Sequence, residues 1–180
     1  MNTYIALLRG INVGGHKKVP MAELRKLLTS AGFRDVKTYI QSGNVILNTS
    51  GKSQHKIESQ ISKSILEHFK FEVPVIVRTR EDLLVIFEAC PFSEVQKEKS
   101  YFILLSDIPE AKFVDEVSTI SYENEAFKIV NDCLYFYSSV GYGRTKFNMS
   151  ALERKLNVRA TSRNYKTMLK LLSLSQNLLK

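Results

Sequence analysis

The order of hydrophobic patterns along the chain is the feature that most restricts its fold, because the same order occurs twice. The first half has an apolar strand at 3–9, a helical stripe at 21–31 and two short strands around "QSG". A long helix with isoleucines every four residues and a strand at 73–77 follow. This order, strand–helix–strand–strand–helix–strand, is that of the ferredoxin-like unit.

The second half repeats the order of elements without repeating the residues. We predict a strand at "YFILLS", a short helix at "PEAKFVDEV", a hairpin formed by "AFKIV" and "LYFYSS", a helix near 145–157 and an extended "VRATS". The last helix is expected to begin near Arg163, capped by Thr161 or Ser162. The predicted fold is therefore α+β, with two ferredoxin-like βαββαβ halves, antiparallel sheets and a C-terminal helix.

A helix is expected to connect the two halves. The residues "TRED" open a helix at 80–89, where Thr79 is the predicted cap and Asp82 follows three residues later. We therefore expect an N-terminal half at 1–79, a connecting helix and loop at 80–98, and a C-terminal half with its terminal helix at 99–180.

The net charge of +8 is unevenly distributed along the chain. Residues 133–180 contain nine basic residues and one acidic residue, whereas residues 91–132 contain four basic and nine acidic residues. The first 90 residues contain thirteen basic and eight acidic residues. This bias favours an anionic partner near the C-terminal third, although a solvated basic face without a partner is the commoner explanation of such a pattern.

Several classes of protein do not fit the sequence. No apolar run approaches the roughly 20 residues of a membrane helix, and the start "MNTYIALLRG" lacks a basic leader and a cleavage site. The two cysteines, Cys90 and Cys133, form neither a disulfide framework nor a metal site. We expect a cytoplasmic protein with no cofactor, no bound metal and no membrane partner.

The loop "LRGINVGGHKKVPM" contains half of a phosphate-loop motif. Gly10 and Gly15 have the required spacing, but His16 and Lys17 stand where lysine and a hydroxyl residue should follow. A nucleotide-hydrolysing loop is therefore not expected. What remains is a glycine-rich loop with cations, which would either bind an anion or only connect a strand to a helix.

Two further segments carry candidate anion-binding residues. "YIQSGN" places polar side chains around a hairpin tip, which turn formation alone also explains. In "GYGRTKF", glycines precede two cations close to a predicted helix start, and further cations are expected along one face of the last helix. The candidate anion-binding residues are Arg9, Asn12, Gly14, Gly15, Lys17, Lys18, Gln41, Ser42, Asn44, Arg144, Lys146, Arg163 and Lys166.

The sequence shows no recognisable catalytic group. The three histidines lack metal spacing, and neither cysteine has an evident base. Tyr135 and Tyr137 share one predicted sheet face, which Tyr101 could join, and such aromatics can stack RNA bases. The RNP1 pattern is missing, however, and a core under covering helices explains these tyrosines at least as well.

Four motifs of the chain, "LLRGINVGGHKKVPMAELRKLL", "YIQSGNVIL", "VGYGRTKFN" and "ATSRNYKTMLKL", resemble an uncharacterised bacterial family, domain of unknown function 1697. The resemblance covers nearly the whole chain and implies a cytoplasmic α+β protein with two ferredoxin-like halves. It implies no known activity, substrate or cofactor. Tyr165 is a departure, because tryptophan is expected there in many relatives. The matching positions are Arg9, Gly10, Asn12, Gly14, Gly15, Lys18, Gln41, Ser42, Gly43, Asn44, Gly143, Arg144, Lys146, Arg163 and Asn164.

Two hypotheses about function lead after this reading, and a third possibility, a structural or protein-partner module, would be indicated by an exposed apolar patch. The first is a binding module for a phosphate-bearing partner, such as nucleic acid or a small phosphorylated ligand. The second is an enzyme of unknown reaction that acts on a small anionic substrate. The sequence does not decide between them, and it indicates neither the oligomeric state nor whether the basic regions meet in space.

Overall fold

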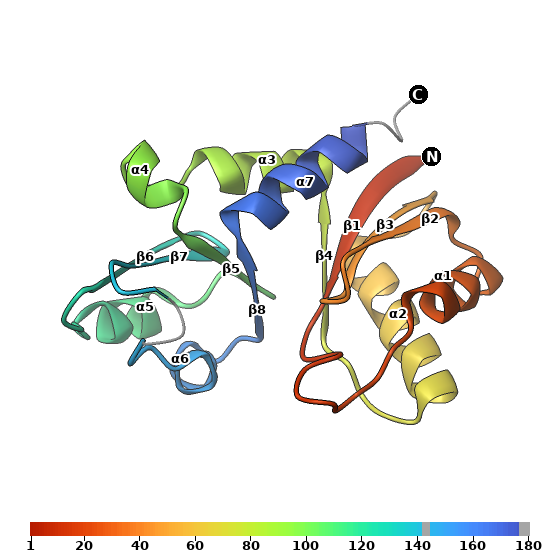
Figure 1. Ribbon diagram of the computed structural model, residues 1–180, viewed down its shortest axis with the longest axis horizontal. Coiled ribbons are helices and arrows are strands. Elements are labelled where there is room, and N and C mark those ends of the chain that lie inside the picture. The colour runs from red at the N-terminus through yellow and green to blue at the C-terminus, as the bar shows by residue number, and fades with distance from the viewer. Residues whose placement is uncertain (142–144, 177–180) are drawn as a thin grey trace. The chain divides into compact units, whose positions relative to one another are not determined.

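The computed structural model describes residues 1–141 and 145–176 (Figure 1). The chain forms two compact units. The first unit consists of residues 1–84 together with the chain from 170 onward, and the second unit consists of residues 85–169. The first unit is therefore discontinuous in sequence, and the second is inserted into it.

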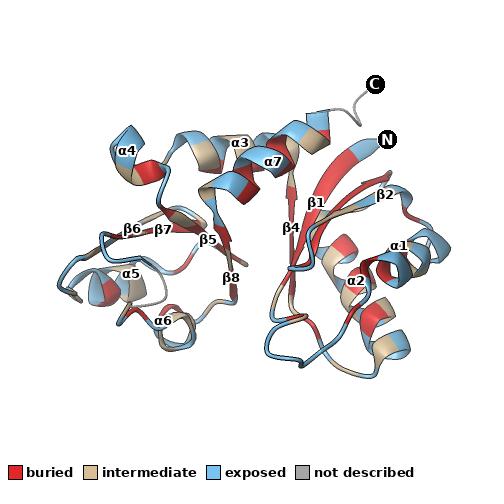
Figure 2. Cartoon of the chain, viewed as in Figure 1, coloured by how far each residue is buried: buried red, intermediate tan, exposed pale blue. Residues whose placement is uncertain are grey.

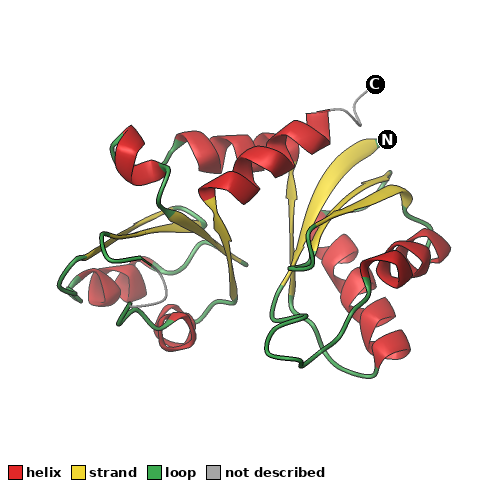
Figure 3. Cartoon of the chain, viewed as in Figure 1, coloured by secondary structure: helices red, strands yellow, loops and turns green. Residues whose placement is uncertain are grey.

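The first unit contains a four-stranded antiparallel sheet with the strand order β2-β3-β1-β4. Figure 3 shows helices α1 and α2 together on one side of this sheet. This is the arrangement expected for a ferredoxin-like unit. Its elements are β1 (Asn2–Leu8), α1 (Met21–Ser30), β2 (Arg34–Tyr39), β3 (Asn44–Thr49), α2 (Gln54–Phe69) and β4 (Val75–Thr79).

The core of the first unit explains why its central strands are so apolar in sequence. Alternate residues of β1 point to opposite faces, and Tyr4, Ala6 and Leu8 belong to the core under α1 and α2. Ile5 and Leu7, on the other face, are also fully buried. The isoleucines of α2 line its buried face, as their spacing of four residues predicts.

The second unit repeats this topology with the strand order β6-β7-β5-β8. Ile103, Leu134 and Phe136 form a core with residues of the two helices. The α+β fold with two βαββαβ halves is thereby confirmed. The elements are β5 (Tyr101–Leu105), α5 (Ala111–Ser118), β6 (Glu125–Val130), β7 (Cys133–Ser138), α6 (Met149–Leu156) and β8 (Ala160–Asn164).

The other face of the second sheet is covered by the segment that follows residue 84. Helix α3 (Arg80–Glu88) crosses the division between the units, and the short α4 (Glu94–Lys97) follows it. The Tyr135 hydroxyl donates to the Ile86 carbonyl at 2.7 Å, and Phe87 stacks on Phe102 with ring centroids 5.5 Å apart. This sheet face is part of a packed core and does not present an open stacking surface.

The expected grouping of the tyrosines is wrong for Tyr101. Tyr101 is paired with Phe136 and packs against the core under α5 and α6, whereas Tyr135 lies on the opposite face. Residues paired directly across neighbouring strands share a face, and adjacent residues of one strand do not. The three tyrosines therefore form no common platform for nucleic-acid bases.

The helix boundaries were predicted correctly at α3 and wrongly at the last helix. Thr79 Oγ1 accepts from the Asp82 N–H at 3.1 Å, and Asp82 Oδ2 accepts from the Thr79 N–H at 3.0 Å. Helix α7 (Tyr165–Gln176) begins later than expected, because residues 160–164 are held extended by pairing with β5. Its cap is Asn164, whose Oδ1 accepts from the Thr167 N–H at 2.9 Å.

The buried Tyr135 hydroxyl predicts a loss of stability at alkaline pH. Burial raises the pKa of Tyr135 well above its usual value, whereas an unfolded tyrosine loses its proton near pH 10, at a pKa of about 10. Above that pH the unfolded state binds fewer protons than the folded state, so the free energy of unfolding falls as pH rises. Tyr135→Phe should remove this part of the fall and lower stability at neutral pH by about 1 kcal/mol, because Ile86 loses its donor.

Urea unfolding followed by circular dichroism over a series of pH values tests this prediction. Tyr137→Phe is the control. The centroids of the Tyr137 and Phe92 rings lie 6.2 Å apart, and a phenylalanine at position 137 keeps this ring contact without the hydroxyl. An alkaline decline of equal size in the Tyr135→Phe variant would contradict the assignment.

Candidate functional site

Three loops of the first unit meet at one corner, which we call the glycine corner: residues 9–19, 40–43 and 70–74. Backbone hydrogen bonds join them at the end of β1. The Leu8 N–H donates to the Gly43 carbonyl at 2.8 Å, and the Arg9 N–H donates to the Pro74 carbonyl at 3.0 Å. Lys17 Nζ donates to the Glu72 carbonyl at 2.7 Å. Segments distant in sequence are thus held side by side.

Asn12 fixes the shape of the longest of these loops. Its Nδ2 donates to the Val19 carbonyl at 3.0 Å and to the Gln41 carbonyl at 2.8 Å, while its Oδ1 accepts from the Val19 N–H at 2.8 Å. Asn12 itself has a φ of +56°, a conformation that asparagine tolerates better than most residues. Because both Nδ2 hydrogens are directed to carbonyls of the corner, Asn12 acts as a positioning residue.

The hairpin tip packs directly on β1. Gly43 is buried with a φ of +81°, and a Cβ added to it would lie 2.6 Å from Leu8 Cβ. Asn44 is fully buried, and its Nδ2 donates to the Tyr39 carbonyl at 3.0 Å and to Ser42 Oγ at 3.1 Å. Gln41 and Ser42 are exposed at the tip. The tip is therefore a fixed part of the corner, with two polar side chains at its outer surface.

The outer surface of the glycine corner is basic. The three segments contain Arg9, Lys17, Lys18 and Lys70 but a single acidic residue, Glu72. His16, Lys17 and Lys18 are exposed, together with Gly14 and Gly15, and Arg9 is half-buried. Figure 2 shows this loop as a largely exposed segment between β1 and α1.

The distribution of charge between the two units differs from its distribution along the chain. The first unit contains fifteen basic and seven acidic residues, and the second contains eleven of each. The whole net charge of +8 therefore belongs to the first unit. The basic stretch is balanced up to residue 169, because that part belongs to the same unit as the acidic segment 91–132, whereas the chain from 170 onward belongs to the first unit.

One contact in the second unit shows this balance. Lys155 Nζ lies 3.7 Å from Glu116 Oε1 and pairs a basic with an acidic side chain. Glu125 Oε1 accepts from the backbone N–H of Lys146 at 2.7 Å, a contact that does not involve the lysine ammonium group. The side chain of Lys146 is exposed, three residues ahead of α6, whose N-terminal amide at Ala151 is capped by Asn148.

The last-helix candidates do not share a helical face, contrary to expectation. Arg163 lies in β8 and is buried, whereas Lys166 is exposed in the first turn of α7. Arg163 Nη1 donates to Thr161 Oγ1 at 2.9 Å and to the Ser162 carbonyl at 2.7 Å. Burial lowers the pKa of Arg163 to about 10. Arg144 and Gly143 lie outside the described residues.

The structure therefore brings together the candidates from the first unit and leaves the others in the second. The two predicted segments in the first unit, the opening loop and the hairpin tip, meet through the contact between Asn12 and Gln41. The candidates in the glycine corner are Arg9, Asn12, Gly14, Gly15, Lys17, Lys18, Gln41 and Ser42, and Asn44 follows the hairpin tip as the first residue of β3.

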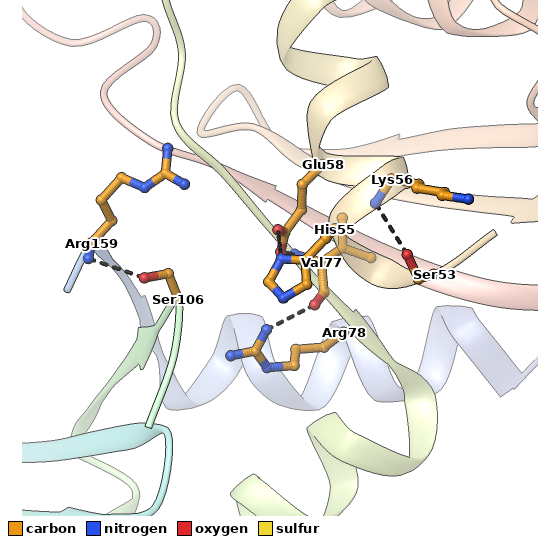
Figure 4. A network of polar contacts seen from close by, with 8 residues as sticks. All are labelled: Ser53, His55, Lys56, Glu58, Val77, Arg78, Ser106 and Arg159. Atoms are coloured by element: carbon orange, nitrogen blue, oxygen red, sulfur yellow. Dashed lines mark hydrogen bonds and ion pairs between the residues drawn. The ribbon is translucent and has the colours of Figure 1, made fainter. Parts of the chain in front are cut away.

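Sequence reasoning did not find a polar network at the outer edge of β4 (Figure 4). Glu58 Oε1 accepts from the Val77 N–H at 2.8 Å, and Glu58 Oε2 lies 3.1 Å from His55 Nδ1. Arg78 Nη1 donates to the Val77 carbonyl at 2.8 Å. These side chains satisfy backbone groups that an edge strand would otherwise present for pairing. The only signal in the sequence is a glutamate next to the buried stripe of α2.

The described residues offer little for nucleophilic or metal chemistry. Burial raises the pKa of the Cys90 thiol, and Cys133 is fully buried. Within residues 1–141 and 145–176, no group of three or more histidine, cysteine, aspartate or glutamate side chains could hold a metal ion. None of the helices in that part of the chain combines the length and apolar composition needed to cross a bilayer.

Comparisons with known proteins agree with this architecture. A family profile described as "Protein of unknown function (DUF1697)" matches residues 1–135. The chain is similar to the solved structure of the conserved bacterial protein SP0830 from Streptococcus pneumoniae, with 25% sequence identity and a TM-score of 0.77. That similarity covers 97% of this chain and 98% of the other. The search of curated proteins found no match.

Two glycines of the corner provide a test of its packing. Gly10 and Gly43 both have positive φ, so alanine at either position should cost about 1–2 kcal/mol of stability. At Gly43 the added Cβ also collides with Leu8, whereas at Gly10 no atom lies within 4 Å of it. Gly43→Ala should therefore destabilise the chain by about 1–3 kcal/mol more than Gly10→Ala. Urea unfolding of both variants measures the difference, and equal losses would show that the tip moves freely.

Proposed function

The chain belongs to the DUF1697 family of proteins of unknown function, and we propose from its own residues that it is a binding module for a phosphate-bearing partner, with nucleic acid as that partner. The observation that carries the proposal is the glycine corner itself. It is exposed, it is basic, and it lies in the unit that carries the whole net charge of +8.

The corner has the features that favour phosphate oxygens. Gly10, Gly14 and Gly15 are exposed and have positive φ, and without a Cβ they let an anion approach the backbone closely. Lys17 and Lys18 stand on the same loop, and residues 9–19 include no acidic side chain. Asn12 holds this loop in place before a ligand arrives, which reduces the entropy lost on binding.

The charge distribution favours a polymer over a small ion. A net charge of +8 confined to one unit attracts a polyanion over a distance, and each phosphate that it neutralises releases counterions. Lys146 and Lys166, both exposed in the second unit, remain further candidate contacts, together with Arg144 outside the described residues, whereas Arg163 is buried. The two cysteines are free thiols, which supports a reducing, cytoplasmic setting.

The alternative is an enzyme that acts on a small anionic substrate. The exposed Gln41 and Ser42 beside the glycine loop support it, because they add hydrogen-bonding groups next to the cations. The proposal of a binding module is preferred, because burial raises the pKa of the Cys90 thiol and Cys133 is fully buried, so neither residue has the environment of a reactive nucleophile.

Binding of a fluorescent oligonucleotide at different salt concentrations tests the proposed function. The affinity of the wild-type chain should fall steeply between about 50 and 200 mM salt. Lys17→Ala/Lys18→Ala should weaken binding and reduce the slope of log K against log salt by about 1 for each lysine. Competition by a nucleoside monophosphate that equals competition by the oligonucleotide would favour the small-substrate alternative.

The matched control is Lys56→Ala/Lys63→Ala, which removes the same charge from the same unit. Both lysines are exposed on α2, and Lys56 lies about 20 Å along that helix from its last residue, where the corner begins. If the control weakened binding as much as the loop variant, the corner would not be the binding site. No binding at low salt would end the proposal.

A further inference from the structure

Two large apolar side chains are exposed on the glycine corner. Val13 is 66% exposed on the opening loop, and Ile40 is 50% exposed at the hairpin tip. Val13 follows Asn12 and Ile40 precedes Gln41 in the chain, and Asn12 Nδ2 donates to the Gln41 carbonyl at 2.8 Å. Both apolar side chains therefore belong to the same corner. They adjoin the exposed cations of the loop, Lys17 and Lys18.

Ile40 occupies a position where the fold does not need an isoleucine. Its φ of +50° is strongly unfavourable for a β-branched residue, and asparagine or glycine would form this turn at lower cost. Its side chain gains little from burial in return, since half of it faces solvent. Strain of this kind is found at functional sites, where the side chain has a role outside the fold.

We infer that the glycine corner binds one nucleotide unit of a single-stranded nucleic acid, with a phosphate at the glycine–lysine loop and an unpaired base against Val13 and Ile40. The inference rests on the proposed function and deepens it. A duplex hides its base faces within the stack, whereas a single strand can turn one face toward an apolar surface. Apolar side chains of this size are also used as wedges against base steps.

A lipid surface is the other occupant that combines negative charge with apolar groups, and the corner fits it less well. Membrane binding strength grows with the apolar area that is buried. The exposed apolar surface of the corner consists of two β-branched side chains on separate loops, 66% and 50% exposed, which is little for a membrane anchor. The charge and the apolar contacts together therefore favour a nucleotide.

The test compares a single strand of about 12 nucleotides with an abasic strand of the same length and the same number of phosphates. The full-length chain should bind the base-bearing strand about five- to tenfold more tightly than the abasic strand. Val13→Ser/Ile40→Asn should remove this preference and leave the salt slope unchanged, because no charge is lost. Asparagine tolerates the positive φ at position 40, so the variant should fold, which circular dichroism checks.

The control variant is Val95→Ser/Ile108→Asn, which makes the same replacements at two residues that are each 69% exposed in the second unit. It should keep the preference for bases. Equal wild-type affinity for the two strands, with a steep salt slope retained, would overturn the inference while the proposed function stands. Binding to phosphatidylserine vesicles that is lost in Val13→Ser/Ile40→Asn would also overturn it, in favour of a lipid surface. Absence of any binding at low salt would instead overturn the proposed function.

Discussion

The position of β1 in the middle of its sheet is the constraint on which the candidate site depends. β1 is paired on both sides, with β3 and with β4, and its hydrogen bonding continues beyond its last residue. The Leu8 N–H reaches the hairpin tip and the Arg9 N–H reaches the segment before β4. Three loops are therefore joined at one corner by the same ladder that builds the sheet, and the apolar core on both faces of β1 holds that ladder in place.

The fold also changes the meaning of the charge pattern. Along the chain, an acidic stretch precedes a strongly basic one, and the basic stretch looks like a separate binding region. In three dimensions the acidic stretch and the basic stretch up to residue 169 belong to one unit, where the contact of Lys155 with Glu116 pairs opposite charges. What remains is the excess of the first unit, whose basic residues are spread thinly in sequence. A bias in sequence indicates a charged surface only where the fold does not bring the compensating charges alongside.

Much of the fold could be predicted because hydrophobic periodicity is local. The four-residue spacing of the α2 isoleucines and the apolar run of β1 identify their elements without tertiary information. The start of α7 could not be predicted, because residues 160–164 become a strand only through pairing with β5. The same holds for the site. The glycines and lysines of the opening loop are visible in the sequence, but the contact of Asn12 with Gln41 joins residues 29 positions apart and depends on the whole sheet.

The discontinuity of the first unit affects how the chain is made. Once the chain has been synthesised as far as residue 84, all four strands of the first sheet are present. The segment from residue 170 onward, which belongs to the same unit, is synthesised later. Residues 85–169, by contrast, are complete before that segment is synthesised. The first sheet, its two covering helices and the core between them all precede residue 84 in the chain, so this part of the first unit can fold during translation, and the segment from residue 170 onward joins it last.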